Sequence, residues 1–189
     1  VKYPGDAELR DSYIDITLQQ AKDNMQDGKI AMAIRDWKDI INSGDEEAVL
    51  IAQNGLYNAY VLEKRYHDAI IMLDDMLLDN PGNAELLLKK SDLYYKEGRY
   101  DYALSIYEQV LGAASQQDRD RLIAGYNEMI LPRVKQLRAD YRLTEARDLS
   151  DRWLTIDQDN QDALLYMINI CFQMKDDAAM LRYAQIAEK

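Results

Sequence analysis

The chain has 189 residues, 48% hydrophobic and 30% charged, so it can bury a substantial core and is not disordered throughout. Its net charge of −11 argues against nucleic acid or an anionic membrane surface as a partner. No apolar run approaches the roughly 18 residues that a spanning helix needs, so we expect no direct membrane insertion.

Apolar residues recur at helical spacing along nearly the whole chain, between short segments that favour turns. The first helix is expected from about Asp6 to Asp27, and nine further helices follow it. We place the turns that separate the ten helices near residues 28, 44, 65, 81, 99, 115, 141, 159 and 176. The pattern therefore predicts an all-α protein.

One long helix is expected between Asp118 and Tyr141, where apolar residues step by three or four. Pro132 interrupts this segment, and proline removes a backbone donor and crowds the preceding turn. We predict a single kinked helix, with two separate helices as the alternative. This helix and the first one are both expected to project about two turns beyond their neighbours.

Two levels of repetition occur in the sequence. Residues 4–9 return as residues 81–86, with a weaker third copy at 158–163. A shorter period lies between these copies, because Ala69 and Ala103 are 34 residues apart. A period of this length is typical of stacked helix pairs, which bury their apolar faces against neighbouring pairs.

The residues that carry this shorter period resemble the tetratricopeptide repeat. In one unit they are Leu87, Lys90, Ser91, Tyr94, Gly98, Tyr100, Ala103 and Tyr107, and in the preceding unit Leu56, Tyr57, Tyr60, Tyr66, Ala69, Leu73 and Pro81. The resemblance is specific over residues 45–111 and generic elsewhere, with Ala33 and Ala146 in looser copies. It implies an α-α superhelix of about ten helices in five antiparallel pairs.

The resemblance also implies an organisation and a way of packing. Residues 1–189 would form one solenoid domain with repeats at about 6–43, 45–80, 82–113, 117–157 and 160–189. Small residues are expected where paired helices meet closely, and larger ones such as Trp37 and Tyr107 are expected to fill the space between repeats. Gly28 and Gly98 are expected to relax the turn inside a pair.

The sequence offers no catalytic, cofactor or metal site. The only histidine, His67, is expected at a surface turn, and the only cysteine, Cys171, lies on an apolar stripe where a packing role is expected. Neither a ligand cluster with metal spacing nor a glycine-rich phosphate loop is present in the sequence. We therefore predict that the chain is not an enzyme.

The resemblance implies that the first helices of successive repeats line a groove for a segment of a partner protein or peptide. The residues carried onto this groove are Leu18, Lys22, Asn54, Asn58, Leu62, Leu88, Asp92, Tyr95, Lys96, Leu131, Lys135 and Arg138. Leucine and tyrosine can bury apolar groups of a peptide, and asparagine can bond its backbone donors and acceptors.

A second interpretation is a structural or assembly spacer within a larger protein, which uses the ends of its repeat array. The last helix carries Leu181, Tyr183 and Ile186, and a polar capping face is not evident there. This favours either a piece of a longer chain or self-association through uncapped ends. Composition favours a bacterial protein of the cell envelope or periplasm, and the compartment is otherwise left open.

Overall fold

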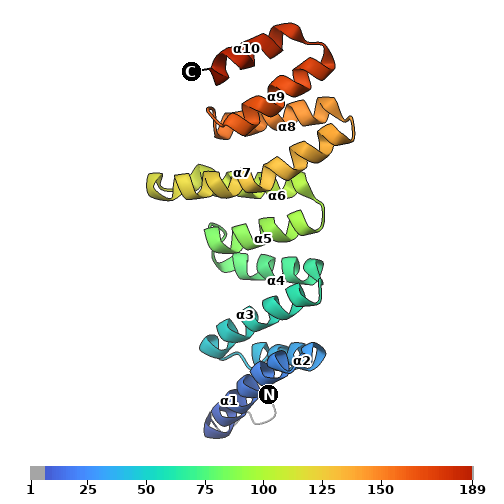
Figure 1. Cartoon of the computed structure of the whole chain (residues 1–189). Helices are drawn as coiled ribbons and strands as arrows, with labels where there is room; N and C mark the ends of the chain where they lie inside the picture. Colours follow the sequence, from blue (N-terminus) through green and yellow to red (C-terminus); the bar gives the residue numbers. More distant parts are fainter. Residues whose placement is uncertain (1–6, 189) are drawn as a thin grey trace. The chain divides into compact units, whose positions relative to one another are not determined.

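The computed structural model describes residues 7–188, and these fold into ten α-helices joined by short turns (Figure 1). The helices are α1 (Ala7–Gln26), α2 (Ile30–Ile41), α3 (Glu46–Leu62), α4 (Tyr66–Asp79), α5 (Ala84–Lys96), α6 (Tyr100–Ala113), α7 (Gln116–Ala139), α8 (Leu143–Ile156), α9 (Gln161–Met174) and α10 (Asp177–Ala187). No strand occurs within these residues, and each of the nine predicted turns falls between two helices. The all-α fold class is confirmed.

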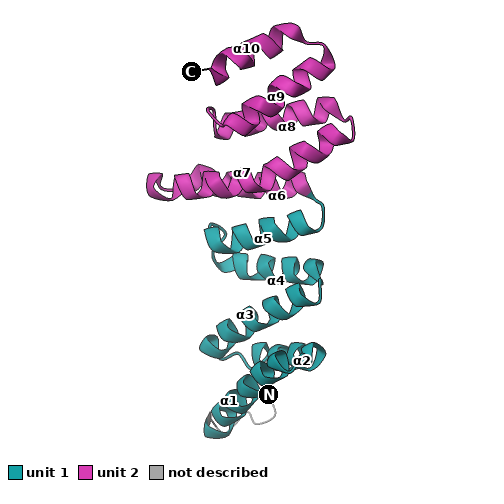
Figure 2. Cartoon of the chain, viewed as in Figure 1, with its two compact units in different colours: residues 1–99 teal, residues 100–189 magenta. Residues whose placement is uncertain are grey.

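The chain divides into two compact units, residues 1–99 and 100–189 (Figure 2). The first unit contains α1 to α5, and the second contains α6 to α10. The division falls between Arg99 and Tyr100, inside the third repeat expected from the sequence. The single domain of five repeats therefore stays a prediction, and the two units are described separately below.

Helices pack on their neighbours in the same order in both units. In the first unit, α3 contacts α1, α2 and α4. In the second unit, α9 contacts α7, α8 and α10. Each of these first helices therefore packs on its own partner and on both helices of the preceding pair, as expected for stacked helix pairs.

Several helices begin at a polar side chain that accepts a backbone N–H group three residues later. Asp45 accepts from Ala48 at 2.9 Å, and Asp176 accepts from Ala179 at 3.1 Å. Asn83 and Asn160, both in the repeated junction segment, cap α5 and α9 in the same way. These caps satisfy donors that the first helical turn leaves unpaired, which explains the helix starts. The hydrogen bond from Ala179, with help from Arg147, lowers the pKa of Asp176.

The turn inside each pair contains one residue in the left-handed conformation. These residues are Gly28, Lys64, Gly98, Tyr141 and Lys175, with φ between 56° and 76°. In each turn the following N–H group donates to a carbonyl five residues earlier, as Arg65 does to Tyr60 at 2.8 Å. This is the Schellman arrangement that ends a helix and reverses the chain. We call these five positions the turn residues, because they give all five pairs a common register.

The predicted small residues lie in the core. Ala33, Ala69, Ala103 and Ala146 each follow a turn residue by five positions, and each is fully buried. The fifth pair has Met180 at this position, and it is only half-buried. The second helices α2, α4, α6 and α8 therefore each bury an alanine at this position, as expected from the repeat.

Aromatic side chains of two second helices pack against glycines of the next first helix. In the first unit, a Cβ atom at Gly55 of α3 would overlap the ring of Trp37 from α2. In the second unit, a Cβ atom at Gly125 of α7 would overlap the hydroxyl of Tyr107 from α6. Trp37 and Tyr107 thus fill the space between neighbouring helix pairs, as predicted, and the glycines make room for them.

The helix α7 continues through Pro132 without interruption. Its 24 residues compare with 14 each in α8 and α9, a difference of about three turns. In Figure 1 the yellow first half and the orange second half of α7 run in different directions, as expected for a kink. The alternative of two helices is wrong. The 20 residues of α1 exceed the 12 of its partner α2 by about two turns, as expected, and exceed the 17 of α3 by less than one turn.

Replacing Tyr141 with glycine should stabilise the protein by about 1 kcal/mol, because a side chain in the left-handed conformation is strained and glycine is not. Tyr141 is exposed, so little packing is lost. Urea unfolding of Tyr141→Gly measures the change. The reciprocal variant Gly98→Ala, which adds a Cβ atom at φ 76°, should lose a similar amount. A Tyr141→Gly variant less stable than the wild type would contradict the strain argument.

Gly55→Ala should destabilise the protein by about 1–3 kcal/mol, because the added methyl group displaces the buried Trp37 ring. The matched variant Gly112→Ala lies in α6 with no atom within 4 Å of the new Cβ atom. It should be neutral or gain up to about 1 kcal/mol from higher helix propensity. Thermal unfolding of both variants would show opposite shifts, and equal shifts would contradict the packing of Trp37.

Candidate functional site

The turn residues align equivalent positions on the first helices α1, α3, α5, α7 and α9. Ten residues before each turn residue lie Leu18, Asn54, Leu88, Leu131 and Leu165. Six residues before it lie Lys22, Asn58, Asp92, Lys135 and Asn169. Two or three residues before it lie Leu62, Tyr95, Lys96, Arg138 and Phe172. Because these spacings fall on one side of a helix, each helix presents them on one face, which we call the first-helix surface.

None of the twelve residues predicted for the groove is buried. Lys22, Asn54, Asn58, Leu62, Lys96 and Lys135 are exposed. Leu18, Leu88, Asp92, Tyr95, Leu131 and Arg138 are half-buried. Nine of the twelve belong to the first unit and three to the second, so each unit carries its own part of the surface. Their joint role in binding stays a prediction.

In the first unit, charged residues of α5 lie close to Tyr57 of α3. The Lys89 ammonium group is 5.5 Å from the centre of the Tyr57 ring. Lys96 donates to Asp92 at 2.5 Å, and this hydrogen bond raises the pKa of Lys96. Burial is the main cause of the raised pKa of Tyr57, with the negative charge of Asp92 adding to it. The charges of Asp92 and Lys96 therefore compensate each other beside an aromatic ring.

A hollow of about 280 Å³ lies between α1 and the start of α3. Leu18 lines it together with Ile14 and Ile51, so one predicted groove residue contributes to a concave apolar floor. Its other lining residues are Ala48, Asp11, Asp15, Asp45 and Glu47, and none of the basic residues within 7–188 lines it. The Asp45 carboxylate is already engaged as the cap of α3. This part of the first-helix surface is acidic.

In the second unit, the first-helix surface combines cations with exposed apolar groups. Arg138 of α7 lies over the ring of Tyr166 of α9, 5.2 Å from its centre. Lys135 has no carboxylate partner among residues 7–188. Leu165 and Phe172 of α9 are exposed. This part of the surface is basic and apolar, in contrast to the hollow between α1 and α3.

Several residues of this surface were not predicted from the sequence. Leu165, Asn169 and Phe172 were not found because the register was counted from the alanines, and the fifth pair has Met180 there instead. A count from the turn residue Lys175 finds all three. Tyr57 and Lys89 were also missed, although Tyr57 had been noted as part of the repeat motif.

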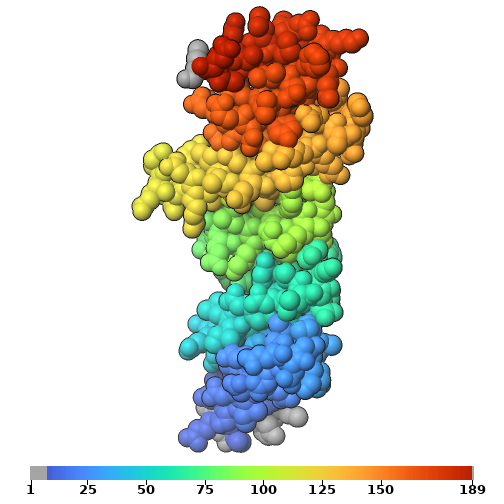
Figure 3. Space-filling view, viewed as in Figure 1, coloured from blue at the N-terminus to red at the C-terminus, as the bar shows by residue number. Residues whose placement is uncertain are grey.

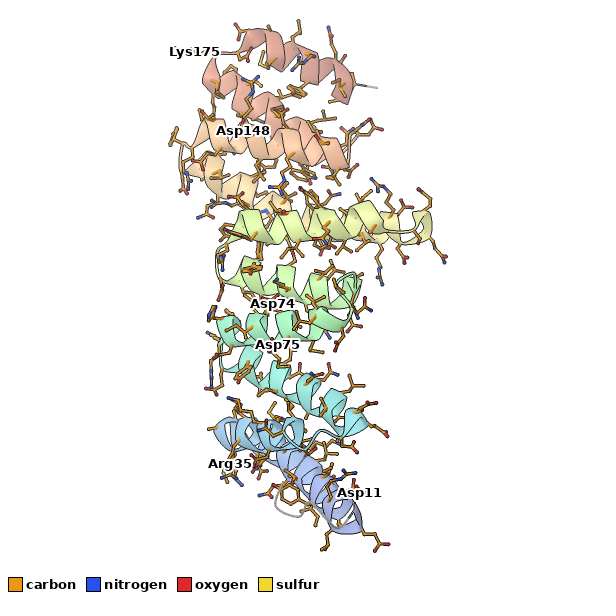
Figure 4. The ribbon with its side chains drawn as sticks, turned by 180° about the vertical axis from the view of Figure 1, so that it is seen from behind. Asp11, Arg35, Asp74, Asp75, Asp148 and Lys175 are labelled. Carbon is orange, nitrogen blue, oxygen red and sulfur yellow. The ribbon has the colours of Figure 1, made fainter. Side chains whose placement is uncertain are left out.

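A second hollow, of about 270 Å³, lies between α6, α7 and α8 in the second unit. Its charged lining includes Asp101, Arg133, Glu145, Arg152 and Asp148, the last of which is labelled on α8 in Figure 4. Two of these cations are engaged inside the unit. Arg133 lies over the Tyr100 ring, 4.4 Å from its centre. The other, Arg152, belongs to a side-chain cluster, which points to a structural role for this hollow.

That cluster joins three helices through one carboxylate. Glu108 of α6 accepts from Arg152 of α8 at 2.5 and 2.9 Å, and from the hydroxyl of Tyr126 of α7 at 2.6 Å. Burial, together with the bond to Glu108, raises the pKa of Tyr126 far above its ordinary value, so the phenol stays protonated and donates. The cluster therefore fixes α6, α7 and α8 to one another.

The two residues considered for chemistry occupy the places expected from the sequence. His67 is exposed near the start of α4. Cys171 is fully buried beside Met167 and Ala179, and burial raises the pKa of its thiol. Among the described residues no cluster of histidine, cysteine and carboxylate side chains could hold a metal ion. Within the same residues no helix is long and apolar enough to cross a membrane.

The left-handed turns, the buried alanines and the aligned first helices define a helical-repeat protein. Residues 60–124 match the model of the tetratricopeptide repeat family, and the resemblance found in the sequence is confirmed. No curated protein matches the chain.

Solved structures with a similar fold are tetratricopeptide proteins. A repeat protein from Parabacteroides merdae ATCC 43184 is 15% identical, with 91% of this chain and 64% of that chain covered and a TM-score of 0.54. The MamA RS-1 ArsTM double mutant is 14% identical over 93% of each chain, with a TM-score of 0.53. The P58(IPK) TPR domain is 17% identical, with 93% of this chain and 60% of that chain covered and a TM-score of 0.51. These likenesses concern the fold.

Replacing Glu108 with alanine should cost about 2–3 kcal/mol of stability, because Arg152 and Tyr126 would lose their shared acceptor in a partly buried place. Urea unfolding measures the loss. The matched variant Glu145→Ala removes an exposed carboxylate that also binds an arginine, Arg142, and should lose much less. Equal losses in the two variants would contradict a joining role for Glu108.

Proposed function

We propose that this chain is a non-catalytic protein-interaction module whose first-helix surface binds an extended segment of a partner protein. The observation that carries the proposal is the alignment of side chains at the same three positions of successive first helices. Tetratricopeptide repeats are protein-binding repeats, which supports the same conclusion. The partner surface is divided between the two units, and each part can be tested by itself.

The leucines that lie ten residues before a turn residue provide apolar contact. Leu18, Leu88 and Leu131 are half-buried, so each rests against its own unit and still leaves part of its side chain for a ligand. Within each unit, a partly exposed leucine on a first helix can contact an apolar side chain of a bound peptide. Burial of those side chains would provide most of the binding free energy.

The residues that lie six positions before a turn residue can form polar contacts with a bound peptide. The Asn58 amide has no hydrogen-bond partner among residues 7–188, so its donors and its acceptor are available to a peptide backbone. The side chain of Asn54, by contrast, donates to the Leu50 carbonyl at 3.0 Å. Lys135 supplies an unpaired positive charge at the corresponding place in the second unit.

The proposal can be tested with peptides selected from a random display library against the wild-type chain. Leu62→Glu in the first unit and Lys135→Glu in the second should lower the affinity for the selected peptides tenfold or more. A central contact residue contributes about 1–2 kcal/mol or more to the binding free energy. Fluorescence anisotropy with labelled peptides measures the affinities. We expect at least one of the two variants to show the loss for each peptide.

The matched control is Leu78→Glu, which makes the same change at an exposed leucine of the second helix α4. It should leave peptide affinity unchanged. Circular dichroism would verify that all three variants keep their helical content. Peptides that bind both surface variants as tightly as wild type, or that lose affinity only with Leu78→Glu, would contradict the proposal.

A further inference from the structure

The first helix exposes apolar side chains on the face where later repeats are covered. Ile16 of α1 lies twelve residues before its turn residue and is 67% exposed. The residues at this position in α3, α5 and α9 are Ala52, Leu86 and Ala163, and all three are buried. Both α3 and α9 pack on the two helices of the preceding pair. Together with the exposed Leu9 and Tyr13, Ile16 forms what we call the N-terminal end face.

The last helix shows the complementary situation. Leu181 of α10 lies six residues after its turn residue and is 59% exposed. The residues at this position in α2, α4 and α6 are Ile34, Ile70 and Leu104, and all three are buried. Figure 3 shows α10, in dark red, at the edge of the second unit. More than half of the Leu181 side chain is therefore open to solvent.

The same end of the second unit exposes two side chains of α9. Leu165 and Phe172 are exposed, whereas Leu131 and Arg138 at the same positions in α7 are half-buried. The difference arises because α9 packs on α7 and no described helix packs on α9 in the corresponding way. Leu165, Phe172 and Leu181 form what we call the C-terminal end face.

We propose that a second copy of this chain docks its N-terminal end face on the C-terminal end face of the first, so that copies stack head to tail. The docking would continue the packing already present inside each unit, where α3 lies on α1 and α2 and α9 lies on α7 and α8. An incoming α1 would occupy the corresponding place on α9 and α10. Ile16 would then meet side chains such as Leu181, as its buried equivalents meet the preceding pair.

Charge complementarity supports the same orientation. Asp23 lies near the C-terminal end of α1, on the side that carries Ile16, and has no cationic partner among residues 7–188. Lys175, labelled in Figure 4, lies just after the C-terminal end of α9 and is exposed without a carboxylate partner in the same range. If α1 of one copy runs parallel to α9 of the other, Asp23 and Lys175 lie at the same end of the contact between the two helices. An antiparallel arrangement would separate them.

The two end faces differ from each other, so the contact is heterologous and does not close a two-fold dimer. Each docked copy leaves one N-terminal and one C-terminal end face free. The assembly should therefore keep growing as concentration rises. Leu165 and Phe172 belong to both the first-helix surface and the C-terminal end face. Ile16 and Leu181 lie outside the first-helix surface, so changes at these two residues test the stacking separately from peptide binding.

Sedimentation velocity and light scattering over a range of concentrations provide the first test. The mass of the wild-type chain should rise with concentration without stopping at a dimer. Ile16→Asp and Leu181→Asp should each be monomeric, because a carboxylate would have to be buried in the docked face. The control Leu78→Asp changes an exposed leucine away from both faces and should assemble like wild type.

An equimolar mixture of the two monomeric variants gives a sharper test. Ile16→Asp retains an intact C-terminal end face, and Leu181→Asp retains an intact N-terminal one. The mixture should therefore form a one-to-one dimer that grows no further, although neither variant associates alone. Circular dichroism should show wild-type helical content in both, since both residues are exposed.

Three results would overturn the proposal. A wild-type chain that is monomeric at every concentration would show that something other than a second copy covers these faces. Either single variant forming dimers alone would indicate pairing of like ends. A mixture that stays monomeric while the wild type assembles would show that assembly uses another surface.

Discussion

Each helix pair of this chain has apolar residues on more than one face, and it can bury them all only by packing against a neighbouring pair. That packing depends on how closely the helices can approach. Ala33, Ala69 and Ala146 allow the approach inside the pairs, and Gly55 and Gly125 allow it between a second helix and the following first helix. A larger side chain at any of these places would push apart a contact on which the neighbouring pairs depend.

The close approach also fixes which residues reach the surface. Once a first helix is held by its partner and by the preceding pair, only one of its faces remains open. In each of the five pairs this face lies at the same number of residues before the left-handed turn residue, although successive turn residues are 34 to 43 residues apart. Extra length is taken up elsewhere, above all in α7, and does not disturb the register.

Most of the fold could be predicted from the sequence because its signals are local. Turn residues, helix caps and the alanine period each act within a few positions, and they located ten helices and nine turns. Pro132 could not be resolved in this way, because whether a proline kinks or ends a helix depends on packing against other helices.

The candidate surface was only partly predictable. Its positions follow from the repeat, so twelve of them were found in the first four pairs. The fifth pair was missed because its defining alanine is replaced by Met180, and only the conformation of Lys175 reveals the register. Contacts between different helices, such as Lys89 with Tyr57 or Arg138 with Tyr166, have no local signal and require the structure.

The three aligned positions of the first-helix surface differ in how similar their residues are from one helix pair to the next. Ten residues before the turn, four of five pairs have leucine, and only Asn54 departs from it. Six residues before the turn, lysine, asparagine and aspartate alternate with no common charge. A uniform apolar row can hold many segments, because burial is not directional. The varied polar row, together with the acidic hollow of the first unit and the basic face of the second, is therefore where discrimination between partners must arise.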